Sequence, residues 1–133
     1  MGRHVSVAFA MVAMLWVGCA WRGPKPLQTF PKVAPSVQVV ALDQEAYQLV
    51  AIQNQQVNAL EDGRLQVQVE LANLSSLDLD IQVQTTFRDS DGMPAGDSTP
   101  FEVLVIPGNG SKLYEVISVR TDPAMYTVQV KTP

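Results

Sequence analysis

Two long stretches of this chain alternate strictly between apolar and polar residues, and this pattern restricts the possible folds more than any other feature. Residues 64–71 (RLQVQVEL) and 77–87 (LDLDIQVQTTF) place an apolar side chain at nearly every second position. A period of two residues is typical of β-strands with one buried face and one face in water, which favours antiparallel pairing. Because the link at residues 73–76 (NLSS) is short and polar, we expect the two strands to be neighbours.

Four further segments have the composition and the boundaries of short strands. They are residues 37–42, 101–106, 112–120 and 125–131, each bounded by Pro, Gly, Asn or Asp. Several short strands at this spacing, without helices between them, predict an all-β protein. We expect an antiparallel β-sandwich of about seven strands.

Residues 44–60 (QEAYQLVAIQNQQVNAL) fit a helix and a strand about equally. Their Ala, Leu, Gln and Glu favour a helix. The following Glu61-Asp62-Gly63 is typical of a hairpin turn, which favours a strand before it. In a strand, Asn54 would interrupt the inward-facing apolar residues.

The N-terminal residues have the layout of a secretory signal peptide that ends at a cysteine. Arg3 precedes an apolar run over residues 5–18, and Cys19, the chain's only cysteine, follows directly. This order resembles the bacterial lipobox, in which a peptidase cuts before the cysteine and acyl chains such as palmitate are attached. Trp16 departs from the leucine usual in that motif. An uncleaved membrane anchor over residues 5–21 is the alternative, at the short limit for spanning a bilayer.

We therefore expect three parts: a signal peptide at 1–18, the lipidated Cys19 with a stalk over 19–36, and a β-sandwich domain over 37–133. Residues 22–36 contain four prolines and no periodicity, which predicts an extended spacer outside the fold, with a disordered tail that has no spacer role as the alternative. The domain holds all 13 acidic residues of the chain and only five basic ones. This charge is a poor match to the phosphates of nucleic acid, so we expect no nucleic-acid partner.

Three segments carry a resemblance to a known family: GRLQVQVELANLSS, FRDSDGMP and DPAMYTVQV, within residues 47–131. Together they resemble the YcfL-type predicted periplasmic lipoproteins, whose biochemical role is largely undefined. The resemblance implies an immunoglobulin-like sandwich in which the region matching 47–60 is a strand, so we take 44–60 as a strand. The chain departs from that family at Asp89, where an aromatic residue is usual, and at Phe101, where a tryptophan is usual.

The residue inventory argues against an enzyme. His4, the only histidine, lies in the predicted signal peptide, and the only cysteine is predicted to carry lipid. The mature domain would then lack the imidazole and thiol groups of Ser-His-Asp and Cys-His catalysis and of histidine-bound zinc. We expect no catalytic residue and no cofactor.

Three carboxylates around a glycine, Asp89, Asp91 and Asp97, are weak candidates for a divalent-cation site. Oxygen-rich loops of this kind bind calcium, but the glycine and the last acidic residue do not match the EF-hand spacing. A β-hairpin with Asp91-Gly92 in its turn is the favoured interpretation, and we expect no metal.

Two surfaces are candidates for binding a partner. The first is polar and uncharged, with Gln66, Gln68, Gln82 and Gln84 on neighbouring strands, and it suits hydrogen bonds to a glycan or a peptide. The second is the edge of the strand at 125–131, where Thr127 and Gln129 would accept a partner strand. Residues 101–106 are apolar on both sides. That strand is either central and covered on both faces, or it exposes an apolar patch.

These features predict a lipid-anchored, non-catalytic binding or accessory module of the bacterial cell envelope. Ala20, rather than Asp, follows Cys19, which in enterobacteria-like sorting implies the outer membrane, with the domain facing the periplasm. The expected partners are the membrane, through Cys19, and an envelope protein or cell-wall component. The alternative is a structural subunit of an envelope assembly such as a ring or a pilus-like machine, and a lipid-anchored enzyme is the weakest of the three hypotheses.

Overall fold

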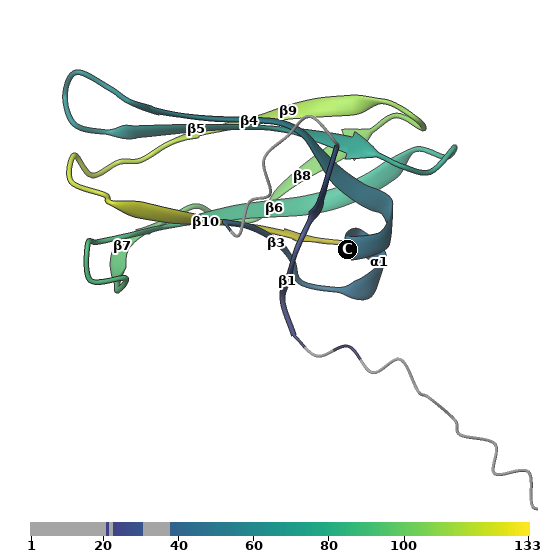
Figure 1. The fold of residues 1–133 in the computed structure, drawn as a ribbon, viewed down its shortest axis with the longest axis horizontal. Coiled ribbons are helices and arrows are strands. Elements are labelled where there is room, and N and C mark those ends of the chain that lie inside the picture. Colours follow the sequence, from purple (N-terminus) through teal and green to yellow (C-terminus); the bar gives the residue numbers. More distant parts are fainter. Residues whose placement is uncertain (1–20, 22, 31–37) are drawn as a thin grey trace, which may run out of the picture.

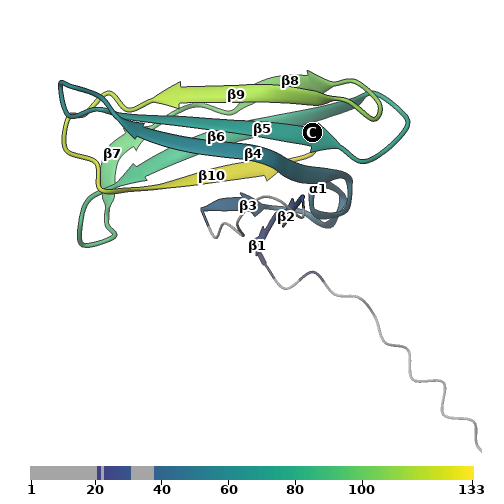
Figure 2. The same cartoon turned by 45° about the horizontal axis from the view of Figure 1, so that its top comes forward.

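Two β-sheets face each other in the computed structural model, which describes residues 21, 23–30 and 38–133 (Figures 1 and 2). The prediction of an all-β sandwich is confirmed. The described residues form ten strands and one short helix, where the sequence predicted about seven strands. The three additional strands are β1 (Lys25–Pro26), β2 (Gln28–Thr29) and β7 (Pro94–Ser98).

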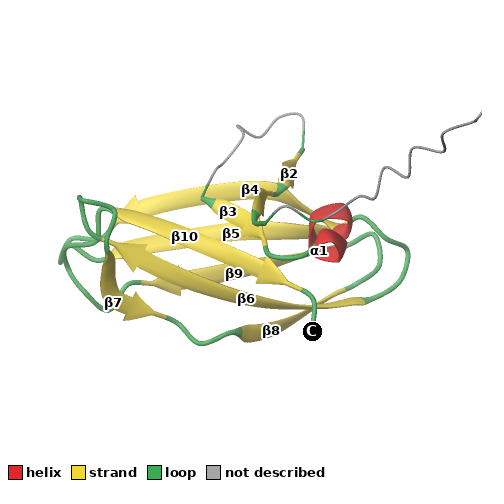
Figure 3. Ribbon diagram, turned by 90° about the horizontal axis from the view of Figure 1, so that it is seen from below, coloured by secondary structure: helices red, strands yellow, loops and turns green. Residues whose placement is uncertain are grey.

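The first sheet is centred on β6 (Leu79–Arg88), the second of the two alternating stretches. On one side β6 pairs along seven residues with β10 (Met125–Lys131), and on the other it pairs in turn with β7 and β8 (Glu102–Ile106) (Figure 3). Next to β10 lies β3 (Val39–Ala41), which is parallel to it. This sheet is therefore mixed rather than purely antiparallel.

The second sheet has the order β2-β4-β5-β9. It contains β4 (Val50–Ala59), β5 (Leu65–Asn73) and β9 (Ser111–Ile117), and β5 pairs antiparallel with both of its neighbours. The predicted pairing of the two alternating stretches is wrong, because β5 and β6 belong to different sheets. The link at residues 74–78 crosses from one sheet to the other, so the buried faces of both strands point into the same core.

Residues 25–29 belong to the sandwich, although the sequence predicted a stalk over 19–36 outside the fold. β1 pairs with β3 of the first sheet, and β2 pairs in parallel with β4 of the second sheet. Leu27, between them, is buried in the core. Prolines are tolerated here because β1 is an edge strand that contributes few hydrogen bonds.

Residues 44–60, interpreted as one strand, divide into a helix and a strand. Helix α1 (Gln44–Leu49) begins at Asp43, whose carboxylate accepts a hydrogen bond from the backbone N–H of Ala46 at 2.8 Å. The other carboxylate oxygen of Asp43 accepts from the backbone N–H of Thr132, which ties the helix to the C-terminal end of β10. No helix among the described residues is long and apolar enough to cross a membrane.

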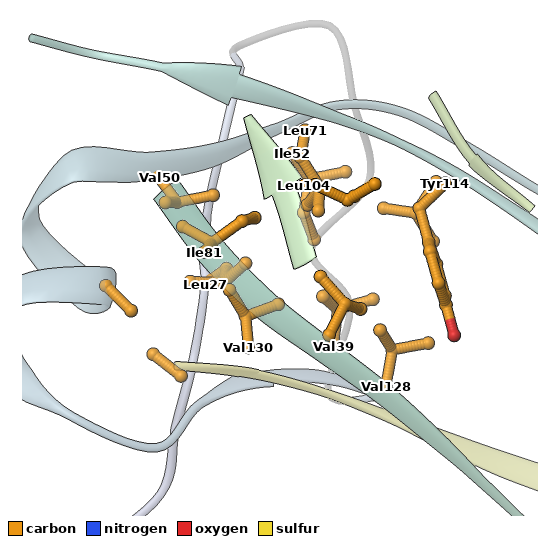
Figure 4. Close-up of a cluster of buried hydrophobic side chains, with 14 of the residues drawn as sticks. Leu27, Val39, Val50, Ile52, Leu71, Ile81, Leu104, Tyr114, Val128 and Val130 are labelled. Carbon is orange, nitrogen blue, oxygen red and sulfur yellow. The ribbon is translucent and has the colours of Figure 1, made fainter. Parts of the chain in front are cut away.

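The core is almost entirely aliphatic at the end of the sandwich nearest α1. Figure 4 shows Val50, Ile52 and Leu71 from one sheet facing Ile81 and Val130 from the other. One polar pair lies inside this core. The hydroxyl groups of Thr85, on β6, and Tyr114, on β9, are 2.8 Å apart and both residues are buried, so this hydrogen bond joins the two sheets.

Candidate functional site

Five carboxamide side chains gather on the outer side of the second sheet. Asn54, Gln56 and Asn58 of β4 lie beside Gln66 and Gln68 of β5, with Asn58 opposite Gln66 and Gln56 opposite Gln68. We call these five residues the amide face. Two of the predicted residues, Gln66 and Gln68, are part of it.

A β-bulge explains why the β4 amides point outward. The register shifts between Ile52 and Asn54, so Gln53 is an extra residue that breaks the alternation. Before the bulge, Val50 and Ile52 point into the core. After it, Gln55 points inward and donates a hydrogen bond to the Tyr126 hydroxyl of the opposite sheet. The predicted interruption at Asn54 is therefore absorbed by one inserted residue.

The amide face includes a shallow depression of about 40 Å³. It is lined by Asn54, Gln56, Gln68, Glu70 and Leu113. Gln68 donates to the Glu115 carboxylate at 2.6 Å, and Ser111 donates to the Glu70 carboxylate at 2.8 Å, so polar contacts on this sheet fix several of its side chains.

Carboxamides suit the recognition of polar, uncharged groups. Each amide offers two donors and one acceptor with two lone pairs, so neighbouring amides can bind hydroxyl groups or peptide groups in pairs. The two carboxylates nearby, Glu70 and Glu115, add acceptors for ligand hydroxyl or N–H groups. The arrangement fits a glycan or an extended peptide better than an anion.

Gln82 and Gln84 do not extend the amide face. Both lie on β6 in the first sheet, on the opposite outer side of the sandwich. Gln84 donates its side-chain N–H to the backbone carbonyl of Thr99 at 2.8 Å, which holds the segment between β7 and β8. The prediction of one surface formed by all four glutamines is wrong, because β5 and β6 are not neighbours.

The strand that carries Thr127 and Gln129 is not an open edge. β10 lies between β6 and β3, and Val128, Gln129 and Val130 pair with Val39, Val40 and Ala41. A partner strand cannot be added where β3 already lies. Local sequence patterns contain no sign of this parallel pairing, since β3 has only three residues and is separated from β10 by more than eighty.

The three candidate metal ligands are divided between two places: Asp89 and Asp91 lie in the turn between β6 and β7, and Asp97 lies on β7. Asp89 accepts hydrogen bonds from the backbone N–H groups of Asp91 and Met93, which shapes the turn between β6 and β7. Asp97 is buried and accepts from the backbone N–H groups of Val119 and Arg120 at 2.9 and 3.0 Å. In the described part of the chain, no three His, Cys, Asp or Glu residues gather as a metal site would need.

The strand β8 is apolar on both sides but covered on only one. Leu104 and Ile106 are buried, whereas Val103 and Val105 are 58% and 48% exposed. Phe101, just before β8, is 37% exposed and packs against the ammonium group of Lys131, which lies 4.2 Å from the ring centroid. The alternative of a central strand covered on both faces is wrong, and an exposed apolar stripe of Phe101, Val103 and Val105 is present.

The shifted pKa values among the described residues belong to turns and to the core. The backbone N–H and guanidinium of Arg64 lower the pKa of Asp62 at the β4–β5 turn, and Arg120 lowers the pKa of Asp122 by hydrogen bonding to it. Burial raises the pKa of the Tyr126 hydroxyl. None of these groups lies on the amide face, which offers hydrogen bonds rather than a group with a shifted pKa.

Cys19 and the predicted signal peptide at 1–18 lie outside the described residues. The first residue beyond them that the structure describes is Trp21, which packs against the core beside Tyr47 of α1.

No protein-family model and no curated protein sequence matches this chain. Two solved structures have a similar fold. The Campylobacter jejuni protein cj0090 superposes with a TM-score of 0.61 and 17% identity, covering 74% of this chain and 100% of the chain in that structure. A DUF1425 family member from Shewanella sp. pv-4 gives a TM-score of 0.56 and 17% identity, covering 74% of this chain and 93% of that one. The chain is a small β-sandwich protein with the fold of these two.

Proposed function

We propose that this protein is a non-catalytic binding module of the bacterial cell envelope, anchored in the outer membrane by lipid on Cys19 and facing the periplasm. The observation that carries the binding role is the amide face. A sheet surface with five carboxamides and a shallow depression provides many hydrogen-bonding groups, most of them uncharged. Its ligand is a polar, uncharged envelope component, for which the glycan of the cell wall is the first probe.

The anchor rests on the sequence, where a basic residue, an apolar run and a single cysteine follow one another. The YcfL-type resemblance supports the same location, since that family is predicted to consist of periplasmic lipoproteins. The similarity in fold to a DUF1425 family member is compatible with this assignment. We propose that this chain is related to the YcfL-type family, and a wider comparison of sequences tests that relationship.

Binding to cell-wall sacculi tests the proposed role. The detergent-solubilised protein is mixed with isolated sacculi, and the fraction that sediments with them is measured. Replacing Gln56 and Gln68 together by lysine should abolish sedimentation, because both side chains line the depression and lysine has no acceptor.

The matched control replaces Gln82 and Gln129 by lysine on the outer side of the opposite sheet. This variant has the same charge change and should sediment as the parent does. Equal loss in both variants would indicate a charge effect, and unchanged sedimentation in both would refute recognition through the amide face.

A second function, as a subunit of an envelope assembly, is favoured by the exposed apolar stripe on β8. Within the described residues β8 pairs only with β6. The other edge of β8, the strand that carries the exposed Val103 and Val105, therefore has no neighbouring strand there. Exposed apolar patches of this kind mark contact surfaces between proteins. Analytical ultracentrifugation of the parent and of a Val103→Asp variant tests this function: assembly predicts an oligomer that the substitution dissociates, and a monomeric parent contradicts it.

A further inference from the structure

Two aromatic side chains and a lysine cluster where the described chain begins, beside helix α1. The rings of Trp21 and Tyr47 meet edge to face, with centroids 6.2 Å apart. The ammonium group of Lys25 lies 5.0 Å from the Trp21 centroid and 5.5 Å from the Tyr47 centroid. Both aromatic residues pack against the buried core and remain partly exposed, so we call Trp21, Lys25 and Tyr47 the aromatic cluster.

The covalent chain places this cluster close to the proposed lipid anchor. Trp21 is only two residues after Cys19, and two residues span at most about 7 Å. The stalk predicted from the prolines would have held the domain as much as about 45 Å from the membrane at ~3 Å per residue. Because Trp21 and residues 25–29 are part of the fold, that length is not available as a spacer.

The cluster has the composition of a membrane-interface anchor. Trp and Tyr are enriched at the headgroup level of bilayers, where an apolar ring and a polar group are both accommodated. Lys25 adds a positive charge that is attracted to anionic headgroups. The negative charge of Glu45, on the same helix as Tyr47, offsets the positive charge of Lys25. The rings, rather than net charge, therefore provide most of the attraction to the bilayer.

We propose that the aromatic cluster rests on the headgroup region of the bilayer, so that the sandwich stands on the membrane at its α1 end. This inference rests on the proposed lipidation of Cys19. The turn between β6 and β7 lies at the opposite end of the long axis from α1 in every view (Figures 1 and 3). That turn therefore points away from the membrane.

Quenching by spin-labelled lipid headgroups tests this orientation. With Cys19 acylated, an introduced cysteine is the only free thiol, so Gln48→Cys on α1 and Ser90→Cys in the β6–β7 turn can each carry a fluorescent bimane. Both positions are exposed, which keeps the fold intact. The acylated protein is reconstituted in vesicles of phosphatidylethanolamine and phosphatidylglycerol. We expect the spin-labelled lipids to quench the bimane fluorescence at position 48 and to leave the fluorescence at position 90 unchanged.

A spacer variant separates contact by the cluster from the effect of a short tether. A Gly-Ser spacer of about ten residues is inserted between Ala20 and Trp21, which frees the domain to leave the surface. Quenching at position 48 should persist if the cluster binds headgroups. Loss of that quenching, or equal quenching at positions 48 and 90 in the parent, would overturn the inference.

Mass spectrometry before reconstitution distinguishes this failure from failure of the anchor. An unmodified Cys19 would refute the proposed lipidation and, with it, this inference. An acylated Cys19 with no quenching at position 48 would leave the anchor in place and refute the docking alone.

Discussion

The buried hydrogen bond between Thr85 and Tyr114 gives the sharpest stability prediction. It joins the two sheets, its oxygen atoms are 2.8 Å apart, and the two residues are 0% and 3% exposed. Tyr114→Phe removes one hydroxyl and leaves the other buried without this partner. An unsatisfied buried hydroxyl costs about 1–3 kcal/mol, so we expect a loss of that size in the free energy of unfolding.

A double-mutant cycle isolates this interaction. Thr85→Val removes the other hydroxyl at nearly constant volume and should cost about as much as Tyr114→Phe. The double variant, which leaves neither hydroxyl unpaired, should be less destabilised than the sum of the two single variants by about 1 kcal/mol or more. The measurement is urea-induced unfolding of the purified protein. Simple additivity of the two substitutions would refute the proposed coupling between the sheets.

Three further predictions concern the core, the pH dependence and the anchor. Val67→Asp places a charge at a fully buried position of β5 and should unfold the domain, whereas Gln66→Lys on the outer face should be nearly neutral by thermal unfolding; equal sensitivity would contradict the assigned faces. Burial raises the pKa of the Tyr126 hydroxyl above its ordinary value of 10.0. The contribution of this protonated hydroxyl to the free energy of unfolding is therefore complete below pH 10 and is lost as the pH rises through the folded-state pKa. Tyr126→Phe should reduce that alkaline loss in unfolding curves. Cys19→Ser should prevent acylation and leave a larger precursor, and an immunoblot in which this variant is processed and still membrane-bound would contradict the lipid anchor.

The strands were largely predictable because period-two alternation is a local signal. The segment at 125–131 has the bounds of β10, and 101–106 contains all of β8. The alternation of residues 64–71 and 77–87 correctly identified the buried face of β5 and β6, since burial depends on the face of each strand, but Leu77, expected to point inward, precedes β6 and is exposed.

The assignment of strands to sheets was not predictable from these local patterns. Alternation shows which side of a strand is buried but does not identify the neighbouring strand, and the polar link at 74–78 can turn within a sheet or cross between sheets. The parallel contact of β3 with β10 joins residues distant in the sequence. The prolines of residues 24–26 suggested a stalk, yet Leu27 beside them is buried because the segment passes along the open side between the two sheets.

Only the β5 part of the candidate site was accessible from the sequence. Gln66 and Gln68 were identified because they alternate with buried valines in β5. Asn54, Gln56 and Asn58 were missed because one inserted residue, Gln53, shifts the alternation of β4 and conceals its outward face. The run NQQVN at 54–58 contains one apolar residue, Val57, and its inward-facing Gln55 is polar, so apolar–polar alternation gives no signal for this outward face.

Site-specific photocrosslinking in living cells tests recognition through the amide face most directly. A photoreactive phenylalanine analogue is introduced at Gln56 on this face or at Gln82 on the opposite side of the sandwich, and adducts of the lipoprotein are detected after irradiation. We expect an adduct from position 56 and none from position 82. An adduct from position 82 alone, or from neither position while the fold is intact, would contradict recognition through this face.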